Sequence, residues 1–285
     1  KYESLDAAFA AAQEGETITM LDNVTEVFDI DNMANVTFDM DGHTLTGAIT
    51  PSKANVTIKK GTIINENSGV SAIEINEGSL VLNNDVVIKS ARHALRIDGN
   101  VAVTINGGEY KAAIGNGTGT YHALNVSGTA VVTIVDGTFV GPKGTSADSG
   151  AAVNVQTGAT VSISGGNFSG GKNNTLASKG TLTLTGGTYD QDVNVFCADG
   201  YAAITNDNAT WTVIEALTRN LEEGWNWFSS YVVADAEDVQ EALGENGLQI
   251  KSQLGFSQYI EYNGMKFWDG TIPENPSVGM YMSKT

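Results

Sequence analysis

The sequence has few cations, a single cysteine and no long apolar run. Lys and Arg number 15 against 33 Asp and Glu, which gives a formal net charge of −18 at pH 7. A surface this acidic repels phosphate backbones and anionic lipid headgroups, so we expect no nucleic-acid partner. No stretch reaches the roughly 18 consecutive apolar residues that a membrane-spanning helix needs. The sequence therefore predicts no transmembrane segment.

The lone cysteine limits what covalent crosslinking can contribute. Cys197 has no second thiol in the chain and can form no intramolecular disulfide. It lies in the apolar segment 193–198, which predicts a buried strand. Lys1 is not an initiator methionine, and we expect an export signal to have been removed before it.

Glycine, by contrast, is abundant, and many of the 33 glycines belong to a repeated phrase. The phrase consists of a short strand, a glycine corner and an aromatic residue, and it occurs at 104–110, 133–139, 162–168 and 183–189. The corner glycines lie 29, 29 and 21 residues apart, at Gly108, Gly137, Gly166 and Gly187. A period of this length is typical of stacked repeat units. The sequence therefore predicts an all-β fold in which residues 17–208 form a parallel β-solenoid, in particular a right-handed parallel β-helix.

A second phrase keeps the same period and predicts which side chains point inward. Short alternating strands recur at 71–75, 93–97, 122–126 and 151–155. Because successive side chains of a strand point to opposite faces, one ladder is expected inside and one outside. The inner ladder comprises Ile73, Leu95, Leu124 and Val153, and the outer ladder comprises Glu74, Arg96, Asn125 and Asn154. The aromatic residues that follow the corners are expected to form another inward stack, namely Tyr110, Phe139, Phe168 and Tyr189.

The N-terminal residues 1–16 predict a helix that covers one open end of the strand stack. Ser4 is a suitable N-cap and Gly15 a suitable exit for a helix that runs to about Gln13. Leu5, Ala8 and Phe9 share one apolar face of this helix. Such a cover would prevent end-to-end association through unpaired strand edges.

Two segments near the N-terminus carry a resemblance to a known family. Residues 4–18 and the Val-Thr-Phe-Asp-Met-Asp-Gly-His-Thr-Leu segment at 36–45 resemble the opening of the pectin-lyase-like superfamily of right-handed β-helices. That superfamily includes polysaccharide lyases, glycoside hydrolases and many non-catalytic surface proteins. The resemblance therefore implies the fold and leaves the chemistry open.

The composition changes after about residue 208. The glycine phrase stops there, and all four tryptophans follow, at Trp211, Trp225, Trp227 and Trp268. Residues 209–285 are predicted to form a small α+β or mostly β module, with a short helix between Asp235 and Gly244. The Gly-Trp-Asn-Trp run at 224–227 resembles a module that recurs in exported proteins of gut anaerobes. This resemblance implies secretion or display on the outer cell surface.

Glycoside hydrolysis requires two carboxyl groups placed about 5 to 10 Å apart across the sugar. Asp39 and Asp41 satisfy the sequence spacing, as do Asp29 and Asp31. Both pairs flank residues expected to point inward, so solvated strand faces in an acidic protein explain them as well. The catalytic motifs that galacturonan hydrolases of the superfamily carry in consecutive repeats are not matched.

A polysaccharide lyase would instead set a basic side chain opposite a carboxylate-bound calcium ion. Arg96 and Glu74 are the candidates, because they occupy equivalent outward positions and are expected about 4.8 Å apart. A salt bridge between adjacent repeats explains this pair equally well. Calcium is therefore expected only if the protein is a lyase, and no other cofactor is predicted.

Two histidines, His93 and His122, occupy equivalent positions of adjacent repeats. They could share a metal ion if a third ligand joined them. The flanking repeats place Ser71 and Ala151 at that position. Hydrogen-bonded packing is the simpler interpretation, and we predict no metal site.

Two sets of side chains are candidates for contact with a polysaccharide or with a host or cell-surface glycan. The longest segments between strands, at 112–121, 140–150 and 169–174, should cluster on one side. In or beside them lie Tyr121, Lys143 and Lys172. The second set comprises Trp225, Trp227 and Trp268, although a module this small also needs aromatic core volume.

We therefore favour an exported, monomeric, non-catalytic β-helix protein for adhesion or glycan binding at the bacterial cell surface. A polysaccharide lyase or glycoside hydrolase of the pectin-lyase-like fold is the alternative. Its candidate catalytic residues are Arg96, Glu74, Asp39 and Asp41.

Overall fold

A computed structural model describes residues 1–31, 33, 35–115, 120–142, 150–171, 174–206, 208–216, 225–228, 249–251, 256–271 and 281–284. The chain divides into two compact units, Lys1–Ala216 and Leu217–Thr285, which are considered separately below. Among the described residues, no helix is both long enough and apolar enough to span a membrane.

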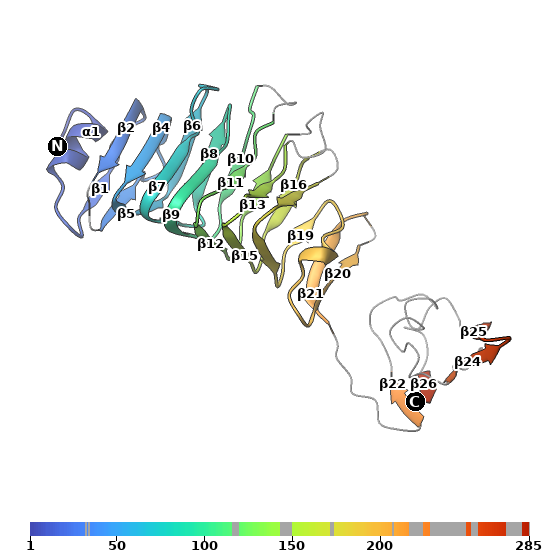
Figure 1. Ribbon diagram of the computed structural model, residues 1–285. Coiled ribbons are helices and arrows are strands. Elements are labelled where there is room, and N and C mark those ends of the chain that lie inside the picture. The colour runs from blue at the N-terminus through green and yellow to red at the C-terminus, as the bar shows by residue number, and fades with distance from the viewer. Residues whose placement is uncertain are drawn as a thin grey trace. The chain divides into compact units, whose positions relative to one another are not determined.

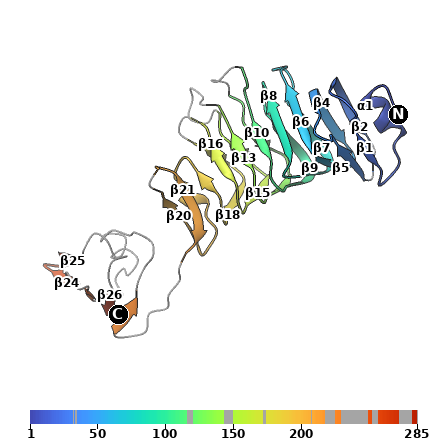
Figure 2. The same ribbon diagram turned by 180° about the vertical axis from the view of Figure 1, so that it is seen from behind.

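The described part of the larger unit is all-β, as the sequence predicts, apart from one short α-helix and one 3₁₀ turn. Its 21 described strands belong to one hydrogen-bonded sheet in which almost all neighbours are parallel. Strands from successive repeats lie side by side along the unit, as the views from both sides show (Figure 1 and Figure 2). Strand pairing joins each repeat to the one before it and the one after it, and it groups the strands into three rows.

The first row, called row A, follows the strand that precedes each glycine corner. Its members are β1 (Thr17–Thr19), β3 (Val36–Asp39), β5 (Ala54–Lys59), the later parts of β7 (Ile73–Leu82) and β9 (Leu95–Ile105), β12 (Val131–Ile134), β15 (Thr160–Ile163) and β18 (Thr181–Leu184).

The second row, called row B, follows the aromatic residue after each corner. It contains the first part of β4 (Thr44–Ser52), then β6 (Gly61–Asn65), β8 (Val86–Ser90), β10 (Glu109–Lys111), β13 (Thr138–Val140), β16 (Asn167–Ser169) and β19 (Thr188–Tyr189). The long edge strand β2 (Val24–Asp31) pairs along its whole length with residues 45–52 of β4.

The third row, called row C, follows the second repeated phrase. It contains the later part of β4, the first parts of β7 and β9, and then β11 (Leu124–Val126), β14 (Val153–Val155) and β17 (Leu176–Ser178). Its register matches the predicted ladders, since Leu95, Leu124 and Val153 lie opposite one another and are buried. The outward partners in this register are half-buried.

The predicted aromatic stack is confirmed in row B. Its four rings have centroids 4.6, 5.0 and 4.9 Å apart and lie nearly parallel, in the order Tyr110, Phe139, Phe168 and Tyr189. All four side chains are buried. The two tyrosine hydroxyls donate hydrogen bonds to the carbonyls of Gly107 and Gly186, so neither buried hydroxyl is left unsatisfied.

The N-terminal helix α1 (Leu5–Ala11) is shorter than predicted but is capped as expected. The Ser4 side chain accepts a hydrogen bond from the Ala7 N–H. The Glu26 carboxylate accepts two more N–H groups of the first turn, at 2.9 and 3.0 Å. Buried Phe9 stacks on Phe28 with ring centroids 5.3 Å apart, which joins the helix to the first strands of the sheet.

At the other end of this unit the repeat is interrupted, and one prediction is wrong. The segment around Cys197 forms a 3₁₀ turn, η1 (Asn194–Phe196), in place of a buried strand, and Val195 is 86% exposed. Cys197 makes only a single bridge to Leu184. An antiparallel hairpin follows, formed by β20 (Tyr201–Thr205) and β21 (Trp211–Glu215), and β21 pairs with β19.

The described strands of the smaller unit form an antiparallel five-stranded sheet. They are β22 (Trp225–Phe228), β23 (Gln249–Lys251), β24 (Phe256–Tyr262), β25 (Met265–Thr271) and β26 (Tyr281–Lys284), in the order β22-β26-β23-β24-β25. The helix predicted between residues 235 and 244 lies outside the described residues.

Candidate functional site

The outward side chains of row C are polar on four successive strands, and this surface is called here the polar face. Register places Glu74, Arg96, Asn125, Asn154 and Ala177 in one line across five strands. The amide of Asn154 donates to the side-chain carbonyl of Asn125 at 2.7 Å, so the two amides orient each other. Gln156 and Lys179 follow on the outward side at the ends of β14 and β17.

Arg96 is tied into ion pairs on this face. Its guanidinium lies 2.5 Å from the Glu74 carboxylate and 3.5 Å from that of Asp98. The predicted contact between repeats is therefore present. Because its guanidinium is engaged by two carboxylates, Arg96 suits the role of a structural cation better than that of the general base a lyase requires.

Asp39, one carboxyl of the predicted pair with Asp41, is engaged by two lysines. Asp39 is 8% exposed and lies 3.2 Å from the Lys59 ammonium and 3.6 Å from that of Lys60. Burial raises the pKa of Asp39, but the Asp41 N–H and the two lysines outweigh burial and hold this pKa below its ordinary value. The carboxyl therefore stays ionised, whereas a general acid must carry a proton. Asp41 sits in a turn with φ 45°.

His93 and His122 pack on each other as predicted. Their rings are stacked with centroids 5.4 Å apart, and His93 Nδ1 accepts a hydrogen bond from the His122 backbone N–H at 2.9 Å. Tyr121 packs edge-on against His93, and the Arg92 guanidinium lies 6.0 Å from the centre of the Tyr121 ring. Tyr121 therefore belongs to this cluster, and it is not among the residues that line the cavity described below.

Both histidines should make the folded state sensitive to acid. Burial, with the nearby His122, Arg92 and Arg96, lowers the pKa of His93 to about 3, and burial lowers that of His122 to about 4. Below pH 6.5 the two imidazoles bind protons in the unfolded chain but remain neutral in the folded chain. The free energy of unfolding therefore decreases as the pH is lowered, until the pH reaches the pKa of each histidine in the folded state. The slope is at most about 1.4 kcal/mol per pH unit for each histidine.

Urea unfolding of the protein and of His93→Asn between pH 7 and pH 4 checks this expectation. Asparagine retains a hydrogen-bond acceptor close to the position of Nδ1. The stability advantage of the natural protein over the variant should shrink as the pH falls from 6.5. Parallel stability curves for the two proteins would contradict the assignment.

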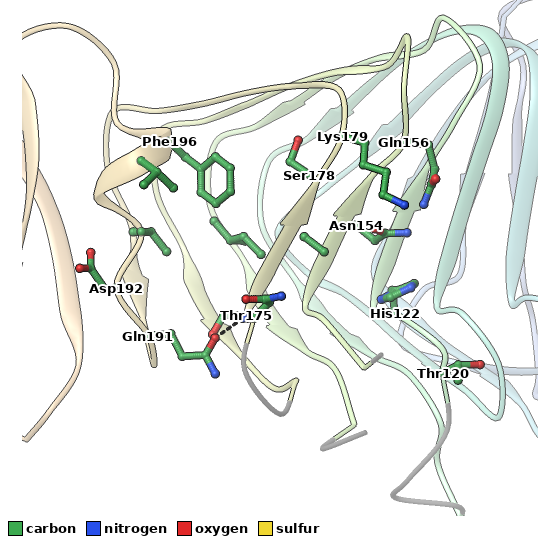
Figure 3. Close-up of a pocket in the computed structure, with 15 residues that line it drawn as sticks. Thr120, His122, Asn154, Gln156, Thr175, Ser178, Lys179, Gln191, Asp192 and Phe196 are labelled. Carbon is green, nitrogen blue, oxygen red and sulfur yellow. Dashed lines mark hydrogen bonds between the residues drawn. The ribbon is translucent and has the colours of Figure 1, made fainter. Parts of the chain in front are cut away.

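A cavity of about 510 Å³, called here the end groove, lies at the end of row C beside the polar face (Figure 3). One wall is β17 with the neighbouring side chains of Asn154 and Gln156. The opposite wall is the segment 191–196, which contains η1. The Thr175 N–H donates to the Gln191 side-chain carbonyl at 2.5 Å and joins the two walls.

The lining of the end groove is mainly uncharged. Amides and hydroxyls are contributed by Thr120, Asn154, Gln156, Asn174, Thr175, Ser178 and Gln191. Lys179 and Asp192 are its two charged residues, and Val193 and Phe196 supply apolar surface. Such a mixture favours hydrogen bonding to a neutral ligand over proton transfer. Among the described residues, no three His, Cys, Asp or Glu side chains are grouped closely enough to hold a metal ion.

Sequence reasoning missed the residues that build this cavity. Gln156, Lys179, Gln191 and Phe196 carry no motif, and the available signal was that the last copy of the second repeated phrase is the one at 151–155. Lys143 and Lys172, predicted to bind, lie outside the described residues, as do the side chains of Trp225 and Trp227. Trp268 is half-buried and packs on Tyr259, with ring centroids 5.5 Å apart.

Comparisons of this chain with models of protein families, with curated proteins and with solved structures give no match.

Proposed function

We propose that the protein is an exported, non-catalytic protein that binds glycan through the polar face of row C. The observation that carries the proposal is the ordered line of outward amides, in which Asn154 and Asn125 hold each other at 2.7 Å beside Gln156 and Lys179. We propose further that residues 17–208 form a right-handed parallel β-helix of the pectin-lyase-like kind. Pairing of strands one repeat apart in three rows supports that fold.

The polar face suits sugar hydroxyls for a geometric reason. Neighbouring parallel strands lie about 4.8 Å apart, so equivalent side chains recur at a spacing close to the length of one sugar unit in an extended chain. Side-chain amides both donate and accept hydrogen bonds, as hydroxyl-rich ligands require. Because the strands are rigid, little conformational entropy is lost on binding.

The absence of cleavage is part of the proposal. Arg96 is engaged by Glu74 of the preceding repeat, and Asp39 is engaged by Lys59 of the following repeat, so contacts between repeats account for three of the four candidate catalytic residues. Secretion, display on the outer cell surface and a monomeric state are proposed with it. They rest on the resemblance of the 224–227 run to modules of exported proteins and on the acidic composition.

A glycan array followed by titration of the best ligand tests the proposal. The double variant Asn125→Ala/Asn154→Ala should weaken binding by about tenfold or more, because it removes several hydrogen bonds worth about 1 kcal/mol each. Thr133→Ala is the matched control, since Thr133 is an exposed outward residue of row A. It should bind like the natural protein.

An assay for new reducing ends and for unsaturated products on the same glycans completes the test. The proposal predicts no product. Cleavage that is lost in Arg96→Ala would replace it with a polysaccharide lyase, and equal glycan binding by the double variant and the control would place the ligand elsewhere.

A further inference from the structure

Row C ends differently from the other two rows. Its last strand, β17, pairs with β14 on one side only. In row A, the last strand bridges to Cys197, and the Ala198 N–H donates to the Leu184 carbonyl at 2.9 Å. In row B, the last strand pairs with β21 of the terminal hairpin. Within the part of the chain that the structure describes, β17 is thus the terminal strand at this end whose outer edge has neither a strand pairing nor a bridge.

The backbone groups on that edge can be identified from the bonds to β14. Val153 N–H donates to the Thr175 carbonyl, and Lys179 N–H donates to the Val155 carbonyl. Backbone groups of alternate residues in a parallel ladder face opposite neighbours. The N–H and C=O of Leu176 and Ser178 therefore face away from β14, and they have no hydrogen-bond partner among the described residues.

The end groove lies where the next strand of row C would stack. β17 forms one wall, and segment 191–196 stands on the other side (Figure 3). The chain passes through this segment as a 3₁₀ turn, so it supplies no strand to β17. Buried Val193 and half-buried Phe196 provide an apolar surface opposite the uncovered edge.

We infer that the end groove binds an extended polypeptide segment, which adds to β17 as one further parallel strand. The ligand residue opposite Ala177 donates its N–H to the Leu176 carbonyl and accepts from the Ser178 N–H. Its side chain points outward and extends the line of Asn125 and Asn154. The two flanking residues point inward, where the ladder of Val153 and Leu176 requires an aliphatic side chain.

The structure favours a single peptide segment over a whole second copy or a glycan. A second copy stacking on this end would present three rows at once, but row B already pairs with β21, and row A is already bridged at Leu184 by Cys197. A glycan does not carry the alternating N–H and C=O groups that complement a strand edge. With a net charge of −18, the protein also disfavours acidic peptides.

The probe is a labelled nonapeptide with the sequence of residues 150–158, Gly-Ala-Ala-Val-Asn-Val-Gln-Thr-Gly, which contains β14 and no acidic residue. This strand already pairs with β17 on its other edge, so its side-chain pattern fits the required register. Fluorescence anisotropy with the full chain should show saturable binding. The same peptide with proline in place of its central asparagine lacks the required N–H and should bind about tenfold more weakly or worse.

The variant Ser178→Pro removes the outward N–H from the protein side. Proline is tolerated at an edge position whose N–H faces solvent, and the bonds from β17 to β14 do not use this N–H. Ser178→Ala is the matched control, because it removes the hydroxyl and retains the N–H. Peptide affinity should fall about tenfold or more in Ser178→Pro and remain unchanged in Ser178→Ala. Unchanged melting temperatures of both variants establish that they fold.

Three results would overturn the inference, and glycan binding is measured alongside each. The first is no binding of the nonapeptide up to millimolar concentration, and the second is equal binding of the nonapeptide and its proline analogue. The third is loss of glycan binding, without any peptide binding, in Ser178→Pro, which would assign the groove to the glycan. If no glycan binds to the polar face but the nonapeptide still binds as expected, the proposed function is wrong and this inference stands.

Discussion

Replacing Phe139 by alanine should lower the free energy of unfolding of the larger unit by about 3–5 kcal/mol. Phe139 has no exposed surface and lies between Tyr110 and Phe168, with ring centroids 4.6 and 5.0 Å away. Removal of the ring leaves a cavity in the middle of a continuous column. The neighbouring backbones cannot close it, because their spacing is fixed by parallel hydrogen bonds on both sides.

Urea unfolding followed by far-UV circular dichroism measures this loss. Phe139→Leu retains most of the side-chain volume and should lower the free energy of unfolding clearly less than Phe139→Ala. The difference between the two variants distinguishes the effect of the cavity from the loss of ring stacking. Thr138→Ala is the matched control, because it truncates the half-buried neighbour of Phe139 in the same strand and leaves the aromatic column in place. If Phe139→Ala were no more destabilising than Thr138→Ala, the column would contribute nothing to stability.

Replacing Gly108 by alanine should be similarly damaging for a different reason. Gly108 has φ 99°, and a Cβ at this position would lie 2.4 Å from the carbonyl oxygen of Val86 in the preceding repeat. A residue with a Cβ pays about 1–2 kcal/mol for the left-handed backbone, and the overlap with a fixed backbone atom adds about 1–3 kcal/mol. We therefore expect a loss of about 2–5 kcal/mol.

Gly42→Ala separates these two costs. Gly42 also has a positive φ, of 86°, but a Cβ there would meet no atom within 4 Å. Its replacement should cost only about 1–2 kcal/mol, in the same urea titration. Equal losses in the two variants would show that the close approach of neighbouring repeats at the corners does not matter for stability.

The parts of the fold that follow from the repeat were predictable. Alternation in the strands at 93–97 and 122–126 places Leu95 and Leu124 inside, and the pairing register confirms this because those residues lie directly opposite each other. The aromatic column was predictable for the same reason. When each repeat stacks on an equivalent one, a single repeat determines the position of the next.

The end groove was not predictable, because it arises where the repeat fails. Segment 193–198 has the composition of a buried strand, yet local hydrogen bonds compete with strand pairing there. Asp192 accepts the Asn194 N–H at 2.9 Å, and the Asn194 side chain bonds the backbone of Ala203. These contacts hold η1 away from β17. No sequence pattern predicts that these local hydrogen bonds stabilise a turn more than the apolar segment 193–198 favours a strand.

Contacts with partners far away in sequence were not predicted for individual residues. Tyr121, a candidate for ligand contact from its loop, packs on His93, 28 residues earlier, and its role in binding stays a prediction. Asp39 was expected on a solvated face, but it is nearly buried because Lys59 of the next repeat neutralises it. Sequence periodicity predicts which positions are equivalent, whereas charge pairing across repeats depends on which residues occupy them.

The equal spacing of the aromatic column bears on how such a chain can change its length. Tyr110, Phe139 and Phe168 follow one another at identical intervals of 29 residues, and the strands around them keep one register throughout. Removing one whole interval at the genetic level would bring Tyr110 onto Phe168 with every neighbouring pair preserved. Duplicating an interval would lengthen the polar face by one strand. Recombination in units of one interval would thus alter the length of the polar face and leave both ends of the unit intact.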